Sequence, residues 1–247
     1  MTNRQPHIFQ QFDQVIAAES LRHGGVSPAP FSSLNLGLYT EDKAEHVEEN
    51  RRRFFQGLGL EEREVAGAHQ VHKDEVQLVE QAGQYDGVDA LITDQPNVFL
   101  TITVADCIPI LIFDADKEVI GAAHAGWRGS VAEIGRKTIK AMEQHFGTRP
   151  QSCFMYIGTS IDYDSFEVDN DVAMHFDQTF KKWDEEKQKF FVDLKKFNQY
   201  YLEKMGVPIH QIEVSKFSTV KNNEDYFSYR KEKGNTGRAL GLIGMRR

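Results

Sequence analysis

The sequence predicts a mixed α/β fold of the α+β class, in which helices pack on a mixed sheet. Nearly continuous apolar runs of strand length fill the central third of the chain, and such runs are typical of strands covered on both faces. Segments with apolar residues at helical spacing lie on either side of them. The 247 residues contain neither a fixed-period repeat nor a long Pro/Ser/Gly-rich linker. We therefore expect a single domain over residues 1–247.

The N-terminal third predicts turns followed by a helix. Glycines at 24, 25 and 37, together with Asn35, indicate turns at which backbone can approach a neighbour closely. Over residues 43–57, the apolar Ala44, Val47 and Phe54 fall on roughly one face, which predicts a helix. The same segment carries a basic turn at residues 50–53.

The central third predicts four strands, over residues 76–79, 98–105, 108–113 and 119–125. Residues 114–117 form a turn sequence between the last two, which indicates a hairpin and therefore a mixed sheet. A helix is predicted to begin at Ser130, which forms a capping-box pattern with Glu133, and to end at Gly147.

The last third predicts one more helix and one more strand. Asp193 is placed to cap a helix that ends at Gly206. The apolar spacing of residues 209–217 predicts the strand.

Composition excludes several classes of partner. Lys and Arg number 29 against 37 Asp and Glu, a formal net charge of −8, so we expect no nucleic-acid partner. The most apolar stretch, residues 98–113, is interrupted by Asp106 and Cys107 and is too short to span a bilayer as a helix, so no membrane association is expected. No apolar secretion signal opens the chain, so we expect a cytoplasmic protein with both cysteines reduced and Cys153 in the core.

Three polar interruptions of apolar strands indicate a shared site. They are Gln70-Val71-His72, Ala105-Asp106-Cys107 and the segment containing His124. Buried polar groups need partners, and one thiolate with two imidazoles suits Zn²⁺ with an open fourth position. Two alternatives remain: a buried thiol beside a satisfied core histidine, or a Cys107 nucleophile activated by His124 without metal. His69 should point away from His72, since three residues separate them in an extended strand.

Arginines near turns indicate anion binding. Residues 126–129 form a tight turn before the predicted helix, which would place backbone amides and Arg128 near a helix N-terminus. Arg51 and Arg230 supply further guanidinium groups suited to phosphate. The alternative for each of these three arginines is that it lies on a solvated surface or forms an ion pair.

Taken together, these segments resemble one family, the YfiH-like family long labelled multicopper polyphenol oxidase or laccase-domain proteins. The resemblance covers nearly the whole chain in the family's order, and it is carried by Arg22-His-Gly-Gly-Val-Ser27, Leu34-Asn-Leu-Gly37, Asn50-Arg51, Gln70-Val-His72, Asp89-Ala90 with Thr93, Ala105-Asp-Cys-Ile-Pro109, His124-Ala-Gly-Trp-Arg-Gly129, Phe166-Glu-Val168, Val192-Asp-Leu194, Ser228-Tyr-Arg230 and Thr236-Gly-Arg238. The chain departs from the family's usual residues at Leu21, Gly158-Thr159 and Ser218-Thr219.

The resemblance implies a fold related to the catalytic domain of cytotoxic necrotizing factors, and a zinc site formed by His72, Cys107 and His124. It also implies a purine nucleoside enzyme, which phosphorolyses adenosine, inosine, guanosine and methylthioadenosine and deaminates adenosine. Other descriptions of the family are copper-dependent oxidation of phenols and editing of peptidoglycan precursors.

Weighing these functions favours the purine nucleoside enzyme. Multicopper chemistry needs roughly ten histidines with His-x-His pairs, whereas this chain has nine histidines and no such pair, so copper at the site would be adventitious. In deamination the zinc would activate water, with Asp106 as a possible proton shuttle. In phosphorolysis Arg51, Arg128 and Arg230 would hold phosphate, and Asn35 and Gln70 complete the expected substrate-binding set.

Two alternatives from other classes stay open. One is an amidohydrolase with a Cys107 nucleophile and a His124 base, acting on peptide or muropeptide amides. The other is a regulatory protein that binds nucleoside or metal without turnover.

Overall fold

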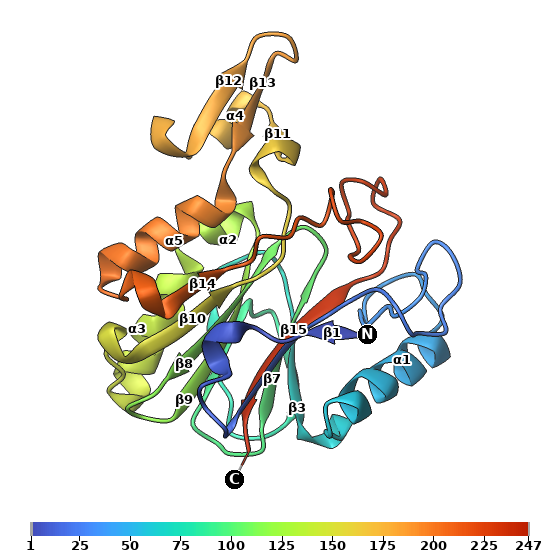
Figure 1. Ribbon diagram of the computed structural model, residues 1–247, viewed down its shortest axis with the longest axis vertical. Coiled ribbons are helices and arrows are strands. Elements are labelled where there is room, and N and C mark those ends of the chain that lie inside the picture. Colours follow the sequence, from blue (N-terminus) through green and yellow to red (C-terminus); the bar gives the residue numbers. More distant parts are fainter. Residues whose placement is uncertain (1, 247) are drawn as a thin grey trace.

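The computed structural model describes residues 2–246 and forms two six-stranded sheets packed face to face, with helices outside them (Figure 1). The strands of the first sheet follow the order β1 (Asn3–Arg4), β2 (Val15–Ser20), β15 (Ala239–Met245), β7 (Phe99–Val104), β3 (Val65–His69) and β5 (Gly83–Asp86). Strand β3 pairs in parallel with β7 and β5, and the other pairs are antiparallel.

The second sheet is also mixed. Its strands follow the order β14 (Ile212–Val214), β10 (Cys153–Ile157), β8 (Ile108–Asp114), β9 (Val119–Ala125), β6 (Ala90–Thr93) and β4 (Val76–Leu78). The pairs β10–β14 and β4–β6 are parallel, while β10–β8, β8–β9 and β6–β9 are antiparallel.

Strand β8 shows why the central runs are apolar on both faces. Ile110 and Ile112 belong to the core cluster that includes the helix residues Ile139 and Leu202, whereas Leu111 belongs to the cluster between the two sheets. Alternate side chains of a strand point to opposite faces. A strand that lies between another sheet and a layer of helices must therefore be apolar at every position.

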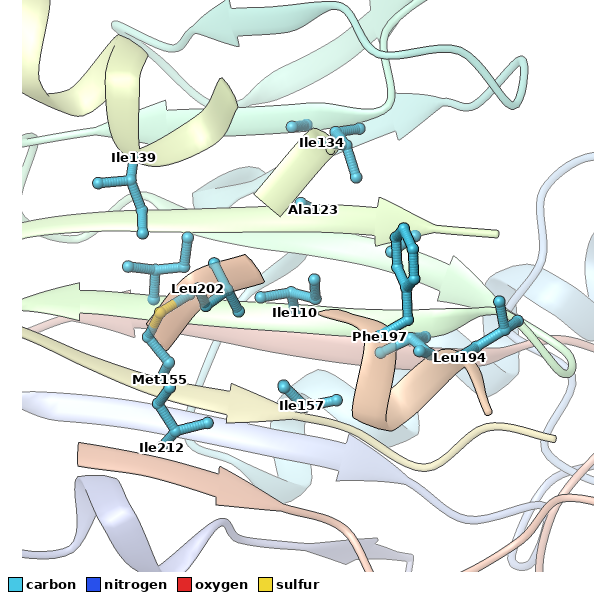
Figure 2. Packing of buried hydrophobic residues seen from close by; sticks show 14 of the residues in the cluster. Ile110, Ala123, Ile134, Ile139, Met155, Ile157, Leu194, Phe197, Leu202 and Ile212 are labelled. Carbon is cyan, nitrogen blue, oxygen red and sulfur yellow. The ribbon is translucent and has the colours of Figure 1, made fainter. Parts of the chain in front are cut away.

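Helices cover the outer face of each sheet (Figure 1). Helix α1 (Ala44–Gly57) packs on the first sheet through Phe54 and Phe55. Helices α3 (Ile134–Phe146) and α5 (Leu194–Met205) pack on the second sheet. Figure 2 shows Ile139 of α3 beside the strand that carries Ala123, and Leu202 of α5 near Ile110 and Met155.

Shorter elements complete the chain. The chain also contains two short helices, α2 (Trp127–Val131) and α4 (Asn170–Ala173). In addition it has 3-10 turns at His7–Phe9, Glu62–Glu64, Pro150–Ser152, Tyr163–Ser165, Gln178–Phe180 and Ile209–Gln211. A third sheet, with the order β11 (Glu167–Val168), β13 (Lys189–Val192) and β12 (Lys181–Asp184), projects from the body of the molecule (Figure 1). Within residues 2–246, no helix is both long and apolar enough to cross a membrane.

The structure confirms the α+β class and most of the predicted elements. The first helix, the four central strands and the hairpin at 114–117 lie where they were expected, to within one or two residues. Helix α5 is capped by Asp193, whose carboxylate accepts a hydrogen bond from the Lys196 amide, and it ends at Gly206. The relation to the necrotizing factor domain stays a prediction.

Three predictions need correction. The central strands belong to two sheets rather than one, because the chain alternates between the sheets from β3 to β8, and its last crossing there is at residues 105–107. Ser130 does not cap a helix: it lies inside α2, where its hydroxyl accepts a hydrogen bond from Asn198, and α3 begins after Glu133. The strand predicted over 209–217 opens with a 3-10 turn, and only Ile212–Val214 pairs with β10.

The space between the sheets should be sensitive to truncation of side chains. Leu111 is fully buried there, so Leu111→Ala removes apolar contacts and leaves a cavity. We expect a loss of about 2–5 kcal/mol in the free energy of unfolding, measured by urea denaturation. Lys140→Ala on the exposed face of α3 is the control and should change it by less than about 0.5 kcal/mol; an equal effect of the two changes would contradict this packing.

Candidate metal centre and adjoining cavity

His72, Cys107 and His124 lie together, as the sequence predicts. Their ligand atoms all lie within 4.8 Å of one another. His124 comes from β9, Cys107 from the crossing between the sheets, and His72 from the turn that follows β3. His124 is buried, Cys107 is partly buried and His72 is exposed. The three side chains, hereafter the metal triad, therefore have one protected side and one open side.

A buried carboxylate, Asp89, organises the metal triad. It precedes β6 and accepts a hydrogen bond from His124 Nδ1 at 2.8 Å, which leaves Nε2 of that ring for a metal. The same carboxylate accepts hydrogen bonds from the backbone amides of Val71, His72 and Lys73, at 3.1, 3.0 and 2.8 Å. These amides hold His72 in a left-handed conformation with φ of 59°. One side chain thus orients one ligand and fixes the backbone of another.

The pKa shifts follow from this arrangement. Burial opposes ionisation of the Cys107 thiol, but His124 and His72 outweigh burial and lower its pKa to about 6. Burial likewise opposes protonation of His124, but Cys107 and Asp89 raise its pKa to about 9. Burial disfavours the charged form of Asp89, yet the hydrogen bonds from His124 and Lys73 lower its pKa. Without metal, Cys107 and His124 form a thiolate–imidazolium pair at neutral pH.

The absence of a side chain at Gly126 leaves space for the side chains of the metal triad. A Cβ atom at this position would lie 3.0 Å from Cys107 Sγ and 3.5 Å from His72 Cδ2. Glycine thus lets the backbone after β9 run directly beside the ligands.

The residues fit a zinc ion. One thiolate and two imidazoles form a borderline-soft donor set, and the hydrogen bond from His124 to a carboxylate is the usual support of a metal-bound histidine. Three protein ligands with one exposed side match the open coordination of catalytic zinc sites rather than the closed coordination of structural ones.

The metal triad opens into a cavity of about 520 Å³, within the range of small-molecule sites. Aromatic and apolar side chains form much of its wall, and Tyr39 stacks on His69 there with ring centroids 3.9 Å apart. The lining also contains Gln70, Asp106, Arg230 and Arg238.

Asp106 and Gln70, both predicted site residues, line the cavity with side chains that are already engaged. The Asp106 carboxylate accepts hydrogen bonds from the hydroxyls of Thr219 and Ser228, at 2.5 and 2.7 Å, and from the Arg230 amide at 2.6 Å. It therefore fastens a C-terminal loop over the cavity. The Gln70 amide exchanges hydrogen bonds with the backbone of Thr103.

Arg51, Arg128 and Asn35 lie outside the cavity lining. Arg51 is buried behind it, where it donates to Glu62 at 2.6 Å and to the Leu36 carbonyl at 3.2 Å. Arg128 is exposed and stacks over Trp127. Asn35 is fully buried and holds backbone around the cavity. Of the three arginines predicted to bind phosphate, only Arg230 lines the cavity.

The sequence analysis placed Gly126 in a tight turn and named Asp89 and Arg238 only among the motifs of the family resemblance, and it assigned none of the three to the metal triad or its cavity. Asp89 directly precedes an apolar strand. It therefore shows the same pattern as Cys107, a polar residue next to a buried apolar segment, and this pattern could have identified it. His69 also lines the cavity, because the chain turns after β3 instead of continuing as the extended strand that was assumed.

Comparisons with known proteins agree with this architecture. A family model described as multi-copper polyphenol oxidoreductase laccase matches residues 16–246. The protein named purine nucleoside phosphorylase YlmD from Bacillus subtilis is 33% identical over 252 residues, which cover 96% of this chain and 91% of that protein. Purine nucleoside phosphorylase from Deinococcus radiodurans is 38% identical over 232 residues, with 93% and 89% covered.

Solved structures extend the comparison to the fold. The crystal structure of YlmD from Geobacillus stearothermophilus superposes with a TM-score of 0.93 at 30% identity, covering 100% of this chain and 97% of that one. The Bacillus licheniformis protein titled hypothetical protein YfiH gives the same TM-score at 29% identity, with 99% and 97% covered.

Metal retention should depend on His72. His72→Ala removes one of three ligands on the exposed side of the site, so we expect loss of bound zinc without loss of the fold. Metal content after gel filtration, with circular dichroism, measures this. His69→Ala, which changes a histidine of the same cavity outside the metal triad, should retain its metal. Full zinc occupancy in His72→Ala would contradict the ligand assignment.

Asp89→Asn should weaken zinc binding by roughly 10- to 100-fold, the usual cost of losing such a supporting group. The side-chain amide of asparagine has one acceptor oxygen, whereas the donors around Asp89 bond to two carboxylate oxygens. The amide also lacks the negative charge that orients His124. Competition with a zinc chelator gives the affinity. Asp86→Asn, an exposed carboxylate beside His69, is the matched control; equal affinities in both variants would refute the role of Asp89.

Proposed function

Because the chain belongs to the YfiH-like family, whose model is described as multi-copper polyphenol oxidoreductase laccase, we propose that it is a zinc-dependent purine nucleoside phosphorylase. Its substrates would be inorganic phosphate and adenosine, inosine, guanosine or methylthioadenosine, with adenosine deamination as a second activity. The names of its relatives support a purine nucleoside as substrate. The single observation that carries the proposal is a metal triad that opens into a cavity also lined by guanidinium groups.

Phosphorolysis sets clear requirements for the cavity. A phosphate oxygen bonds to C1′ of the ribose as the C1′–N9 bond breaks, the electron pair of that bond passes to the purine, and the purine takes up a proton. Positive charge develops on the ribose, so phosphate must be held against it by groups fixed in advance. Arg230 meets this need: its amide is anchored by Asp106, and its guanidinium donates to the Glu167 carbonyl at 3.0 Å.

The metal triad would hold zinc, which when bound supplies Lewis-acid chemistry. With Nδ1 of His124 hydrogen-bonded to Asp89, Nε2 of that ring would be the atom that holds the zinc. Asp106 would contribute to proton transfer in deamination only if it released one of its three hydrogen bonds, so we assign it chiefly to positioning the loop that carries Arg230.

Copper-dependent phenol oxidation fits these residues less well. Within residues 2–246, the metal triad is the one group of metal-ligating side chains of this kind. A multicopper oxidase needs several copper sites, each held largely by histidines.

A second function is favoured by one specific observation. Cys107, with a pKa lowered to about 6, lies beside His124, and His124 in turn donates to Asp89. This Cys–His–Asp order is that of a cysteine hydrolase. An amidohydrolase, including one that edits the peptides of cell-wall precursors, is therefore the alternative, and it requires a thiolate free of metal.

Product analysis by liquid chromatography and mass spectrometry tests the proposal. Zinc-loaded protein is incubated with adenosine or inosine, with and without phosphate. We expect free base and ribose 1-phosphate only when phosphate is present, and inosine from adenosine in either condition. His72→Ala should lose both reactions because it loses the metal.

Cys153→Ser is the matched cysteine control. Cys153 is buried in the core, away from the cavity lining, so the variant should keep near-normal turnover. If zinc-loaded wild type turned over neither nucleoside while metal-free protein cleaved amide substrates, the amidohydrolase would replace the phosphorylase.

A further inference from the structure

Two arginines of the cavity lack a carboxylate partner, whereas most other arginines among residues 2–246 have one. Within residues 2–246, every arginine forms an ion pair with a carboxylate except Arg128, Arg230 and Arg238. Arg230 and Arg238 both line the cavity, in a chain with a formal net charge of −8. Two cations without ion-pair partners, gathered in one cavity of an acidic protein, indicate a site for an anion.

Arg238 is held in place before any ligand arrives. Its Nη1 donates to the carbonyls of Thr236 and Gly237, at 2.8 and 3.0 Å. Its stem passes over Gly37, where a Cβ atom would lie 2.7 Å from Arg238 Cγ. The side-chain oxygen of Asn35 accepts hydrogen bonds from the amides of both Gly37 and Arg238, at 3.1 and 2.8 Å. A guanidinium fixed in this way loses little conformational freedom on binding an anion.

The surrounding charges leave Arg238 without a partner of its own. Burial lowers the pKa of its guanidinium, while Tyr229, Cys107 and Asp106 raise it. The Asp106 carboxylate is already engaged by Thr219, Ser228 and the Arg230 amide, and the charge of Cys107 would be taken up by a bound metal. The arginine stays protonated at neutral pH, and among residues 2–246 it forms no direct ion pair with a carboxylate, so an anionic ligand could supply a direct counter-charge.

We propose that Arg238, together with Arg230, forms an oxyanion subsite for inorganic phosphate in the cavity beside the metal triad. The subsite rests on the proposed function for its use in phosphorolysis, but its ability to bind phosphate does not require nucleoside turnover. Asn35 is then a positioning residue, since it holds the backbone on both sides of the Arg238 stem.

Separate subsites for phosphate and for the metal have a kinetic consequence. Loss of Arg238 should raise the KM for phosphate by about tenfold or more, because a charged, bidentate donor is removed. The KM for phosphate should therefore rise by a larger factor than the KM for the nucleoside, because only the phosphate loses its proposed charged partner.

Isothermal titration of inorganic phosphate into the zinc-loaded full chain tests the subsite directly. We expect phosphate to bind wild type and to bind Arg238→Gln about tenfold more weakly or worse. Arg149→Gln removes the same charge from an exposed arginine paired with Asp116, and it should bind phosphate as wild type does.

Arg238→Lys guards against a folding defect, since it keeps the charge and most of the stem while losing the planar fork. It should bind phosphate with an affinity between those of wild type and Arg238→Gln. Equal phosphate affinity in wild type, Arg238→Lys and Arg238→Gln would overturn the subsite, as would the failure of wild type to bind phosphate.

The two proposals can fail separately. Phosphate binding that depends on Arg238, without turnover of any nucleoside, would support the subsite and refute the phosphorylase. Phosphorolysis with an unchanged KM for phosphate in Arg238→Gln would support the phosphorylase and refute the subsite.

Discussion

The site depends on one buried carboxylate. Asp89 is fully buried and accepts hydrogen bonds from His124 and from three consecutive backbone amides. Burying a carboxylate costs free energy unless its oxygens accept hydrogen bonds. The turn after β3 and the His124 imidazole on β9 must therefore both lie next to Asp89. The same hydrogen bonds that stabilise the carboxylate therefore fix the positions of His124 and His72, two of the three residues of the metal triad.

The packing of two sheets explains why a site exists at this place. Cys107 lies where the chain leaves the first sheet and enters the second, and His124 shares its face of β9 with residues of the core between the sheets. Segments far apart in sequence, before β15 and after the turns at 33–37, close the cavity from the side of the first sheet. Each sheet thus contributes ligands or walls that it could not assemble alone.

The sequence predicted the parts of this structure that arise from local periodicity and chemistry. The strand at 119–125 and the helix capped by Asp193 could be inferred from spacing and residue type. The association of His72, Cys107 and His124 could be inferred from polar residues that interrupt apolar strands. The division into two sheets could not, because a strand buried by a sheet and a strand buried by a helix are equally apolar. The partner of Arg51 could not be predicted either. Whether an arginine binds a phosphate or pairs with a glutamate depends on tertiary contacts, and here Arg51 donates to Glu62.

The position of β15 has a consequence for synthesis of the protein. Residues 239–245 form an interior strand of the first sheet, between β2 and β7. While the chain is being made, β2 and β7 leave the ribosome with an unfilled gap between them, and their exposed edges need protection from other chains. Arg238 and the loop fastened to Asp106 emerge just before this strand. The first sheet and the arginine-bearing end of the cavity are therefore completed together, in a late step that joins residues distant in sequence.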